Sequence, residues 1–449
     1  MSTWQPILTG RLADQALKAV IDTAEQIGYP SNLTWKWGWE RDAPHSLGFG
    51  HAGLAVFFCH AGLVLESRKY ARIALLYLND AIDGMRHEKM SHDFYCGISG
   101  ICWAVKHVTS CLNESLDLEE FLTKSASELL RWCRDESPSA ELSNGITGIC
   151  LYIAESKPNS SGNLLSQTVM NVLSKTAEEM PPGITWRVSE TVISYIRRQL
   201  PNVSGNLYST SVGYGVAGVI GALLAIGTIG EYRPKLRELI TSAISWLLAH
   251  RCTEDSPQFP LAVGIDASPF LPPSHGWYLG DPGIFSVLFN AGLLLGFDIW
   301  KTTALEIGRV GATVKNNGQH KVRMPDCTLC HGSAGRAHLY NRIFQATGDD
   351  LFAGEARYWY SRLLSLWNPY NGATSLFEGG HSHGLLSGSA GVGLALLSSV
   401  TSTEPTWDRA ILASYNSNAK PWAGPEQFGE KACQAKMTVL NQGLETGTN

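Results

Sequence analysis

The residues best suited to chemistry lie in one short stretch of this 449-residue chain, Cys327-Thr328-Leu329-Cys330-His331-Gly332. Cysteine thiolate and neutral imidazole are strong zinc ligands, and Cys327, Cys330 and His331 are able to supply three ligands from one segment. Cys330 and His331 stand at the start of a predicted helix, where backbone N–H groups favour the thiolate form. The same residues are compatible with a buried free thiol beside a hydrogen-bonded histidine, with Cys327 as a small apolar residue.

A Cys-x-x-Cys-His stretch also matches covalent haem attachment. The chain offers no second axial-ligand pattern and no recognisable export signal, so we favour the zinc interpretation over haem.

The stretch 327–332 leads into one of seven copies of G-x-x-G, each of which is followed by an apolar run of helical length. The first glycines of the seven copies lie 47 to 70 residues apart, at Gly50, Gly97, Gly145, Gly215, Gly280, Gly332 and Gly388. One copy means little, but seven at quasi-regular spacing indicate a repeat architecture.

Amphipathic helices are predicted between these apolar runs. Residues 118–135 place leucine and phenylalanine at helical spacing opposite glutamate and lysine, and residues 232–251 do the same. Each unit is therefore an apolar inner helix followed by an amphipathic outer one. The first and last repeats lack the polar caps that an open solenoid needs. We therefore predict an all-α fold, a closed α/α toroid of seven helix hairpins, with residues 1–449 as one domain.

Glycines allow close backbone approach where inner helices crowd at one end of such a barrel. The residues just before each first glycine are then predicted to surround one mouth. Two columns hold them: Phe49, Cys96, Asn144, Tyr214, Leu279, His331 and Ser387 in one, and Gly48, Tyr95, Ser143, Gly213, Tyr278, Cys330 and Leu386 in the other.

Composition excludes several other classes of protein. Hydrophobic residues make up 44% of the chain and charged residues 17%, so it is able to bury a large core and is not disordered. The net charge is −5 and no basic block stands out, which argues against nucleic-acid binding.

The chain is expected to be cytoplasmic and to lack a transmembrane segment. The uncharged run between Arg198 and Glu231 is interrupted by Pro201, Asn202 and Asn206, which favours a buried helix pair over a membrane span. The N-terminus lacks the pattern of a signal peptide. Ten cysteines are too sparse for a disulfide scaffold, so reduced thiols are expected.

Three stretches resemble the signatures of the lanthionine synthetase C-like family. They are residues 326–342, which contain the Cys-His pair, residues 277–283 (Trp-Tyr-Leu-Gly-Asp-Pro-Gly) and residues 212–218 (Val-Gly-Tyr-Gly-Val-Ala-Gly). The resemblance extends from about residue 45 to about residue 415 and includes the seven-repeat background.

The resemblance implies an α/α toroid with zinc at its mouth that closes thioether rings in lanthipeptides. A dehydratase partner first converts Ser and Thr of the precursor peptide to dehydro residues. Zinc then holds a peptide cysteine as thiolate, which adds to dehydroalanine or dehydrobutyrine, and a general acid protonates the resulting enolate.

Only part of the family's zinc site matches this sequence. Cys330 and His331 stand at two of the three ligand positions that the resemblance implies, and Tyr278 stands at the third. Tyr278 is either a phenolate ligand, which needs a pKa well below about 10, or an aromatic residue that fills the mouth.

The family's other functional positions are also substituted. Its catalytic histidine corresponds to Tyr214, its arginine to Ser274 and an aspartate to Glu141. We predict Tyr214 and Glu141 as the remaining catalytic candidates, with Tyr214 as a general acid. The alternatives are a hydrogen-bonded aromatic at the rim for Tyr214 and a solvated carboxylate for Glu141.

Three histidines near the motifs are weaker candidates. His275 is a candidate for part of the missing charge or acid role, and the alternative is a structural loop histidine. His381 and His383, before the last repeat, are interpreted as surface loop residues.

Two segments fall outside the repeat pattern. Residues 181–211 account for the longest spacing between repeats and are either a peptide-binding lid beside the mouth or a variable surface excursion. Residues 416–449 form a C-terminal tail.

Two functional hypotheses follow for lanthipeptide maturation. The chain is either an unusual zinc-dependent cyclase that acts on a dehydrated precursor, or a non-catalytic member that binds precursor or supports a dehydratase or a functional cyclase. A glycoside hydrolase on the same kind of toroid lacks support, because the rim columns hold few acids.

Overall fold

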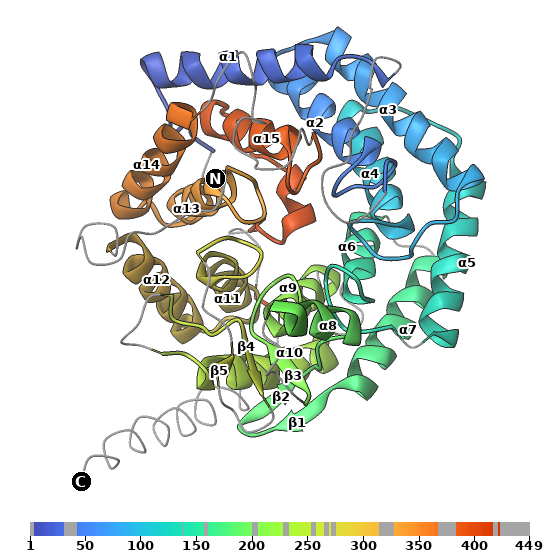
Figure 1. The fold of residues 1–449 in the computed structure, drawn as a ribbon, viewed down its shortest axis with the longest axis vertical. Helices are drawn as coiled ribbons and strands as arrows, with labels where there is room; N and C mark the ends of the chain where they lie inside the picture. The colour runs from blue at the N-terminus through green and yellow to red at the C-terminus, as the bar shows by residue number, and fades with distance from the viewer. Residues whose placement is uncertain are drawn as a thin grey trace.

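The computed structural model describes residues 4–30, 43–136, 138–156, 160–199, 205–227, 233–252, 257–264, 269–270, 275–313, 327–366, 383–415 and 421–422. The helices form two concentric rings (Figure 1), so the predicted α/α toroid is confirmed.

The inner ring consists of the seven helices that follow the G-x-x-G motifs. They are α2 (His51–Val64), α4 (Ile98–Leu112), α6 (Thr147–Glu155), α9 (Val216–Gly227), α11 (Asp281–Leu295), α13 (Ser333–Thr347) and α15 (Ser389–Val400). Six of these helices are largely apolar because neighbours cover every face, whereas α13 also buries Arg336, His338, Asn341 and Arg342. Helix α2, for example, buries every residue from Ala52 to Gly62.

The outer ring carries the amphipathic helices. They are α1 (Gly10–Ile27), α3 (Arg68–His87), α5 (Glu119–Asp135), α7 (Ser160–Thr176), α10 (Arg233–Ala249), α12 (Asp298–Thr313) and α14 (Asp350–Leu366). The outer helices predicted within 118–135 and 232–251 are therefore present. Helix α3 buries Tyr70, Ile73, Ala74, Tyr77 and Leu78, which is the three- and four-residue spacing of one helix face.

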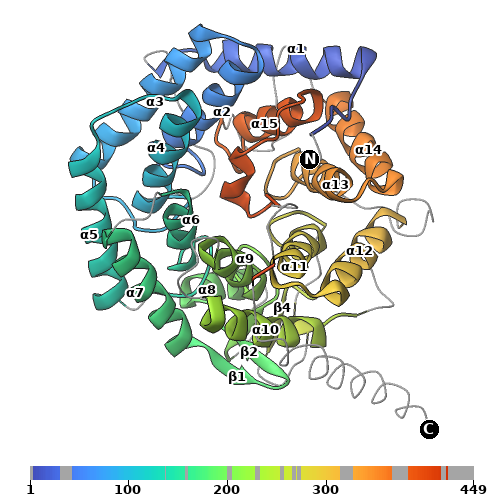
Figure 2. The same ribbon diagram turned by 180° about the vertical axis from the view of Figure 1, so that it is seen from behind.

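The two ends of the described chain together close the toroid. Outer helix α1, which precedes the first motif, packs against α15 and α14 (Figure 2). Just before α1, the indole of Trp4 donates to the Ser398 carbonyl at 3.0 Å, and the backbone N–H of Ile7 donates to the Ser399 carbonyl at 2.8 Å. The seventh hairpin is therefore assembled from α15 and the N-terminal helix.

Short strands and one extra helix interrupt the all-α pattern between α7 and α11. Strands β1 (Glu178–Met180) and β2 (Gly183–Thr185) form an antiparallel hairpin. Strands β3 (Leu207–Ser209), β4 (Ala262–Gly264) and β5 (Pro269–Phe270) form a second antiparallel sheet. Helix α8 (Glu190–Gln199) lies between β2 and β3.

The buried helix pair predicted between Arg198 and Glu231 is wrong. In the described part of this stretch α9 is the one complete helix, and strand β3 precedes it. Within the described ranges, no helix combines the length and the hydrophobicity that crossing a bilayer requires.

The segment after α15 fills the interior of the inner ring. It contains the short 3₁₀ helix η4 (Trp407–Ile411), drawn in red-orange at the centre of Figure 1. Asp408 of η4 accepts hydrogen bonds from Arg342 and His338 of α13, and the Tyr415 hydroxyl bonds Ser286 of α11 at 2.8 Å. This core segment supports the inner helices from within.

Candidate active site at the mouth of the toroid

A ring of backbone hydrogen bonds joins the seven repeats at one end of the toroid. Its members are the residues two positions before each first glycine. The N–H of one residue donates to the carbonyl of the next in six places: Gly48 to Tyr95 (2.7 Å), Ser143 to Gly213 (3.3 Å), Gly213 to Tyr278 (2.9 Å), Tyr278 to Cys330 (3.0 Å), Cys330 to Leu386 (3.0 Å) and Leu386 to Gly48 (2.9 Å). The prediction that this column surrounds one mouth is confirmed.

The second glycine of the motif lets each turn close this tightly. A Cβ atom on Gly335 would lie 1.9 Å from the carbonyl oxygen of Leu329, and one on Gly391 would lie 1.9 Å from that of Leu385. Because no side chain fits there, the motif fixes where each inner helix begins.

Tyr278 lies among the candidate side chains of the mouth. Its ring meets that of Tyr214 edge to face at 5.2 Å between centroids, and that of His331 at 5.4 Å. Its hydroxyl forms a hydrogen bond with the hydroxyl of Ser143 in the third repeat. The fold therefore brings Tyr278, Tyr214 and His331 together, as the column arrangement predicts.

The surroundings of Tyr278 keep its phenol neutral. Burial raises the pKa of Tyr278 well above its usual value, and the neighbouring Tyr214 raises it further. Burial likewise raises the pKa of Tyr95, the corresponding residue of the second repeat. A neutral phenol that is engaged with Ser143 is a poor substitute for a thiolate ligand.

The three predicted metal ligands occupy the sixth repeat as expected but do not converge. Cys327 is fully buried and Cys330 is 5% exposed, with its Sγ 3.5 Å from the hydroxyl of Thr328. The backbone N–H of His331 donates to that same hydroxyl at 3.2 Å. Among the described residues, the one group of three His, Cys, Asp or Glu side chains with ligand atoms within 4.8 Å lies elsewhere in the protein. The mouth donors therefore do not fit a zinc ion as they stand.

Tyr214 connects the mouth to the segment inserted between the third and fourth repeats. Its side chain is half-buried, its ring packs on Tyr278, and its backbone N–H donates to the Ser211 hydroxyl at 3.3 Å. It also packs against a small apolar cluster that is separate from the main core, made of Val188, Val192, Ile193, Ile196 and Leu207. Part of residues 181–211 therefore lies beside the mouth.

Glu141 is buried rather than solvated. It is 2% exposed, and its Oε1 accepts a hydrogen bond from the backbone N–H of Ser189 at 2.6 Å. Burial raises the pKa of the Glu141 carboxyl, against the effect of that hydrogen bond. The contact attaches the third repeat to the residue just before α8.

The remaining candidates are loop residues, two of which lie outside the described residues. His383 is half-buried and its Nδ1 bonds the hydroxyl of Ser389, the first residue of α15, at 2.9 Å, so it is not a free surface residue. His275 is also half-buried. Ser274 and His381 lie outside the described residues, as does the tail 416–449 apart from Pro421 and Trp422.

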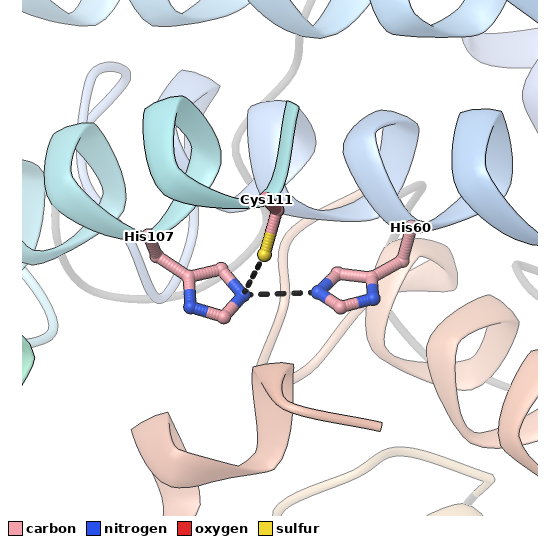
Figure 3. Close-up of side chains that lie close together, drawn as sticks. All are labelled: His60, His107 and Cys111. Atoms are coloured by element: carbon pink, nitrogen blue, oxygen red, sulfur yellow. Dashed lines mark hydrogen bonds between the residues drawn. The ribbon is translucent and has the colours of Figure 1, made fainter. Parts of the chain in front are cut away.

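A second group of potential ligands escaped the sequence analysis. His60 of α2 and His107 and Cys111 of α4 point toward one another (Figure 3), with their ligand atoms within 4.8 Å. The four-residue spacing of His107 and Cys111 is a helical signal that the sequence did offer. His60 comes from another repeat and belongs to no motif, so nothing in the sequence associates it with them.

Comparison with known proteins agrees with the fold. The family model described as lanthionine synthetase C-like protein matches residues 41–412. The solved structure of a nisin cyclase is similar, with a TM-score of 0.63 and 17% sequence identity, covering 83% of this chain and 93% of that chain. At this identity the likeness shows a shared fold. No curated protein sequence matches the chain.

Proposed function

We propose, since this chain belongs to the lanthionine synthetase C-like family, that it acts in lanthipeptide maturation by holding a dehydrated precursor peptide at the mouth of the toroid. The observation that carries the proposal is the backbone ring, which gathers Tyr278, Cys330 and the neighbouring Tyr214 and His331 at one end. The zinc-type site there is partly lost.

The chemistry that such a mouth would assist is the addition of a thiol to a dehydro residue. The peptide sulfur bonds to the Cβ of dehydroalanine or dehydrobutyrine, the carbon–carbon double bond opens, and the resulting enolate takes a proton at Cα. Tyr214 is our candidate for the proton donor, because it is half-buried beside the rim. A phenol is a far weaker acid than an imidazolium, so this step is slow at neutral pH.

Zinc is the family's cofactor, and the residues that would hold it here are Cys330 and His331, with Cys327 as the predicted third. Two features argue against tight binding at the mouth. Cys327 is fully buried, and Tyr278 directs its hydroxyl to Ser143. We therefore propose that this chain retains peptide binding but no longer catalyses efficient cyclisation.

A non-catalytic role is the second candidate function, and the Tyr278–Ser143 contact favours it. In that role the chain presents a dehydrated precursor to, or forms a complex with, a dehydratase or a functional cyclase. Such a complex places the chain in the cytoplasm with its partners. No disulfide joins the nine cysteines that the structure describes, which is compatible with that location.

The segment 181–211 is proposed as a lid over the bound peptide. Its apolar cluster contacts Tyr214, and Glu141 holds the start of α8 through Ser189. Glu141, predicted as catalytic, then acts by positioning this lid, and its role in chemistry stays a proposal.

Binding of a fluorescent dehydrated precursor to the purified chain tests the proposed function. We expect saturable binding that Tyr214→Ala and Glu141→Gln weaken. Asp83→Asn, which changes an exposed residue of outer helix α3, should leave it unchanged. Equal binding of an unrelated peptide of the same length, or no effect of Tyr214→Ala, would refute the proposal that the mouth holds the precursor.

A further inference from the structure

The end of the inner ring opposite the mouth, called the far end below, carries a group of side chains that the proposed function does not use. His60 lies near the C-terminal end of α2, and His107 and Cys111 lie near that of α4. With a rise of 1.5 Å per residue, His107 is about 15 Å along the helix from the turn at Gly97. The group is thus separated from the mouth by most of the height of the toroid.

The three side chains are arranged as metal ligands are. The Nε2 atoms of His60 and His107 are 2.9 Å apart, and the Cys111 Sγ is 3.6 Å from the same His107 nitrogen. Tetrahedral zinc with ordinary bond lengths places two nitrogens about 3.3 Å apart and nitrogen and sulfur about 3.6 Å apart. Only a small widening between the two rings is needed to admit an ion.

A carboxylate orients one of these rings from behind. The Oε1 of Glu155, on inner helix α6, lies 2.9 Å from His107 Nδ1. With its proton on Nδ1, His107 directs a lone pair on Nε2 toward His60 and Cys111. Arg409 of the core segment holds Glu155 in turn, with Nη1 to Oε1 at 3.3 Å. Histidine ligands of metals commonly have such a carboxylate partner, which is an indication independent of the ligand cluster itself.

The three side chains lie largely out of solvent, so an ion among them needs its charge balanced by nearby groups. His60 is 7% exposed and His107 is fully buried, while Cys111 is half-buried. A zinc ion with one thiolate has a net charge of +1, and the nearby Glu155 carboxylate balances it. The ligand set of two imidazoles and a thiolate suits zinc better than the hard cations.

From these contacts we propose that His60, His107 and Cys111 bind one zinc ion at the far end of the toroid, where it clamps α2 to α4. Binding releases the Cys111 thiol proton, and the His60 ring proton that lies between the two Nε2 atoms moves to His60 Nδ1, so that both imidazoles bind as neutral ligands through Nε2. Cys59, which precedes His60 on α2 and whose thiol pKa is raised by the neighbouring Cys111, is a candidate for the fourth ligand. The site is independent of the proposed function and of the ligands at the mouth.

Cobalt titration of the reduced full-length chain, after removal of metal with a chelator, tests the proposal. We expect one equivalent of Co²⁺ to produce visible absorption typical of tetrahedral cobalt and a thiolate charge-transfer band in the near ultraviolet. Zn²⁺ should displace the cobalt and raise the Tm of the protein by several degrees.

Spectra of single-residue variants identify which side chains bind the metal. Cys111→Ser should lose the charge-transfer band, and His60→Gln should lose the tetrahedral spectrum. Glu155→Gln should weaken binding roughly 10- to 100-fold, as loss of such a carboxylate partner typically does. Cys330→Ala at the mouth and the exposed Cys252→Ser should leave the spectrum unchanged.

Each other outcome overturns the proposal. A wild-type chain that binds no cobalt under reducing conditions holds only a hydrogen-bonded histidine pair. A band that survives Cys111→Ser but disappears in Cys330→Ala places the metal at the mouth. If Cys111→Ser fails to fold, loss of the zinc-dependent Tm rise in the folded His60→Gln variant decides the question.

Discussion

The phenol ring of Tyr278 meets the imidazole of His331 edge to face, with 5.4 Å between ring centroids. The two residues occupy neighbouring repeats, and the hydroxyl of Tyr278 continues across the mouth to Ser143. A large neutral side chain therefore stands beside the Cys330–His331 pair, at the position where the family resemblance implies a third ligand. We therefore expect the mouth to bind a peptide without catalysing its cyclisation efficiently.

Gly213 provides a stability test of where Tyr278 lies. A Cβ atom at Gly213 would come within 2.4 Å of the Tyr278 ring. We expect Gly213→Ala to destabilise the protein by about 1–3 kcal/mol through overpacking. In a Tyr278→Cys background the same change should cost at least about 1 kcal/mol less, because the ring is absent. Denaturant unfolding of the four proteins measures this coupling, and strictly additive costs would contradict the contact.

Tyr278→Cys should give the mouth a third ligand, a thiolate, beside Cys330 and His331. We expect the variant to bind an additional equivalent of zinc that depends on Cys330. Tyr278→Phe, which keeps the ring and removes the hydroxyl, is the matched control and should bind none. Metal content is best measured in a Cys111→Ser background, which removes the far-end ligand set. If combining Tyr278→Cys with Tyr214→His produces no cyclisation of a dehydrated precursor, the rest of the mouth has diverged as well.

The sequence was sufficient to predict the toroid and its mouth, because each motif fixes its own helix start. The second glycine meets a carbonyl oxygen that no side chain could approach, as at Gly335, so the motif alone specifies the turn. Cys330, His331, Tyr278 and Tyr214 follow from their places in the two columns.

The features that the sequence did not indicate arise from contacts between segments that lie far apart in the chain. Helix α1 belongs to no motif, yet it completes the outer ring against α15. The burial of Glu141 depends on Ser189, which lies 48 residues away in the inserted segment. His60 reaches His107 across two repeats, and neither position carries a local signal for the other.

The ion pair between Arg342 and Asp408 should stabilise the core segment strongly. Arg342 binds both carboxylate oxygens, with Nε and Nη2 at 2.5 and 2.8 Å, and both side chains are buried. Asp408→Asn removes the buried counter-charge of the guanidinium and leaves only the exposed Glu404 carboxylate beside it, so we expect a loss of about 3–5 kcal/mol. The exposed pair of Asp83 and Arg86 is the control, since Asp83→Asn should change stability by less than about 1 kcal/mol. If denaturant unfolding shows similar small losses of stability for Asp408→Asn and Asp83→Asn, the buried ion pair does not stabilise the core segment as proposed.

Asp281 should make stability depend on pH. Burial raises its pKa to about 6, although the backbone N–H groups of Gln258 and Phe259 donate to its carboxylate. A carboxyl group with a raised folded-state pKa contributes stability below its unfolded pKa and loses it as pH rises through the folded value. A shift of about two units corresponds to about 3 kcal/mol.

Comparison of wild type with Asp281→Asn isolates this contribution from those of other titrating groups. The difference in unfolding free energy, wild type minus variant, should fall by about 2 kcal/mol between about pH 4 and about pH 7. A difference that stays constant or grows over this range would show that Asp281 is not the titrating group.

The most direct test of the central claim counts free thiols while the purified chain, zinc and a dehydrated precursor peptide are incubated together. We predict that thiols disappear no faster than in the enzyme-free mixture, although the same precursor binds saturably to the protein. Thiol loss well above the enzyme-free rate, abolished by Cys330→Ala, would contradict the account and show that the mouth is a working cyclase despite Tyr278.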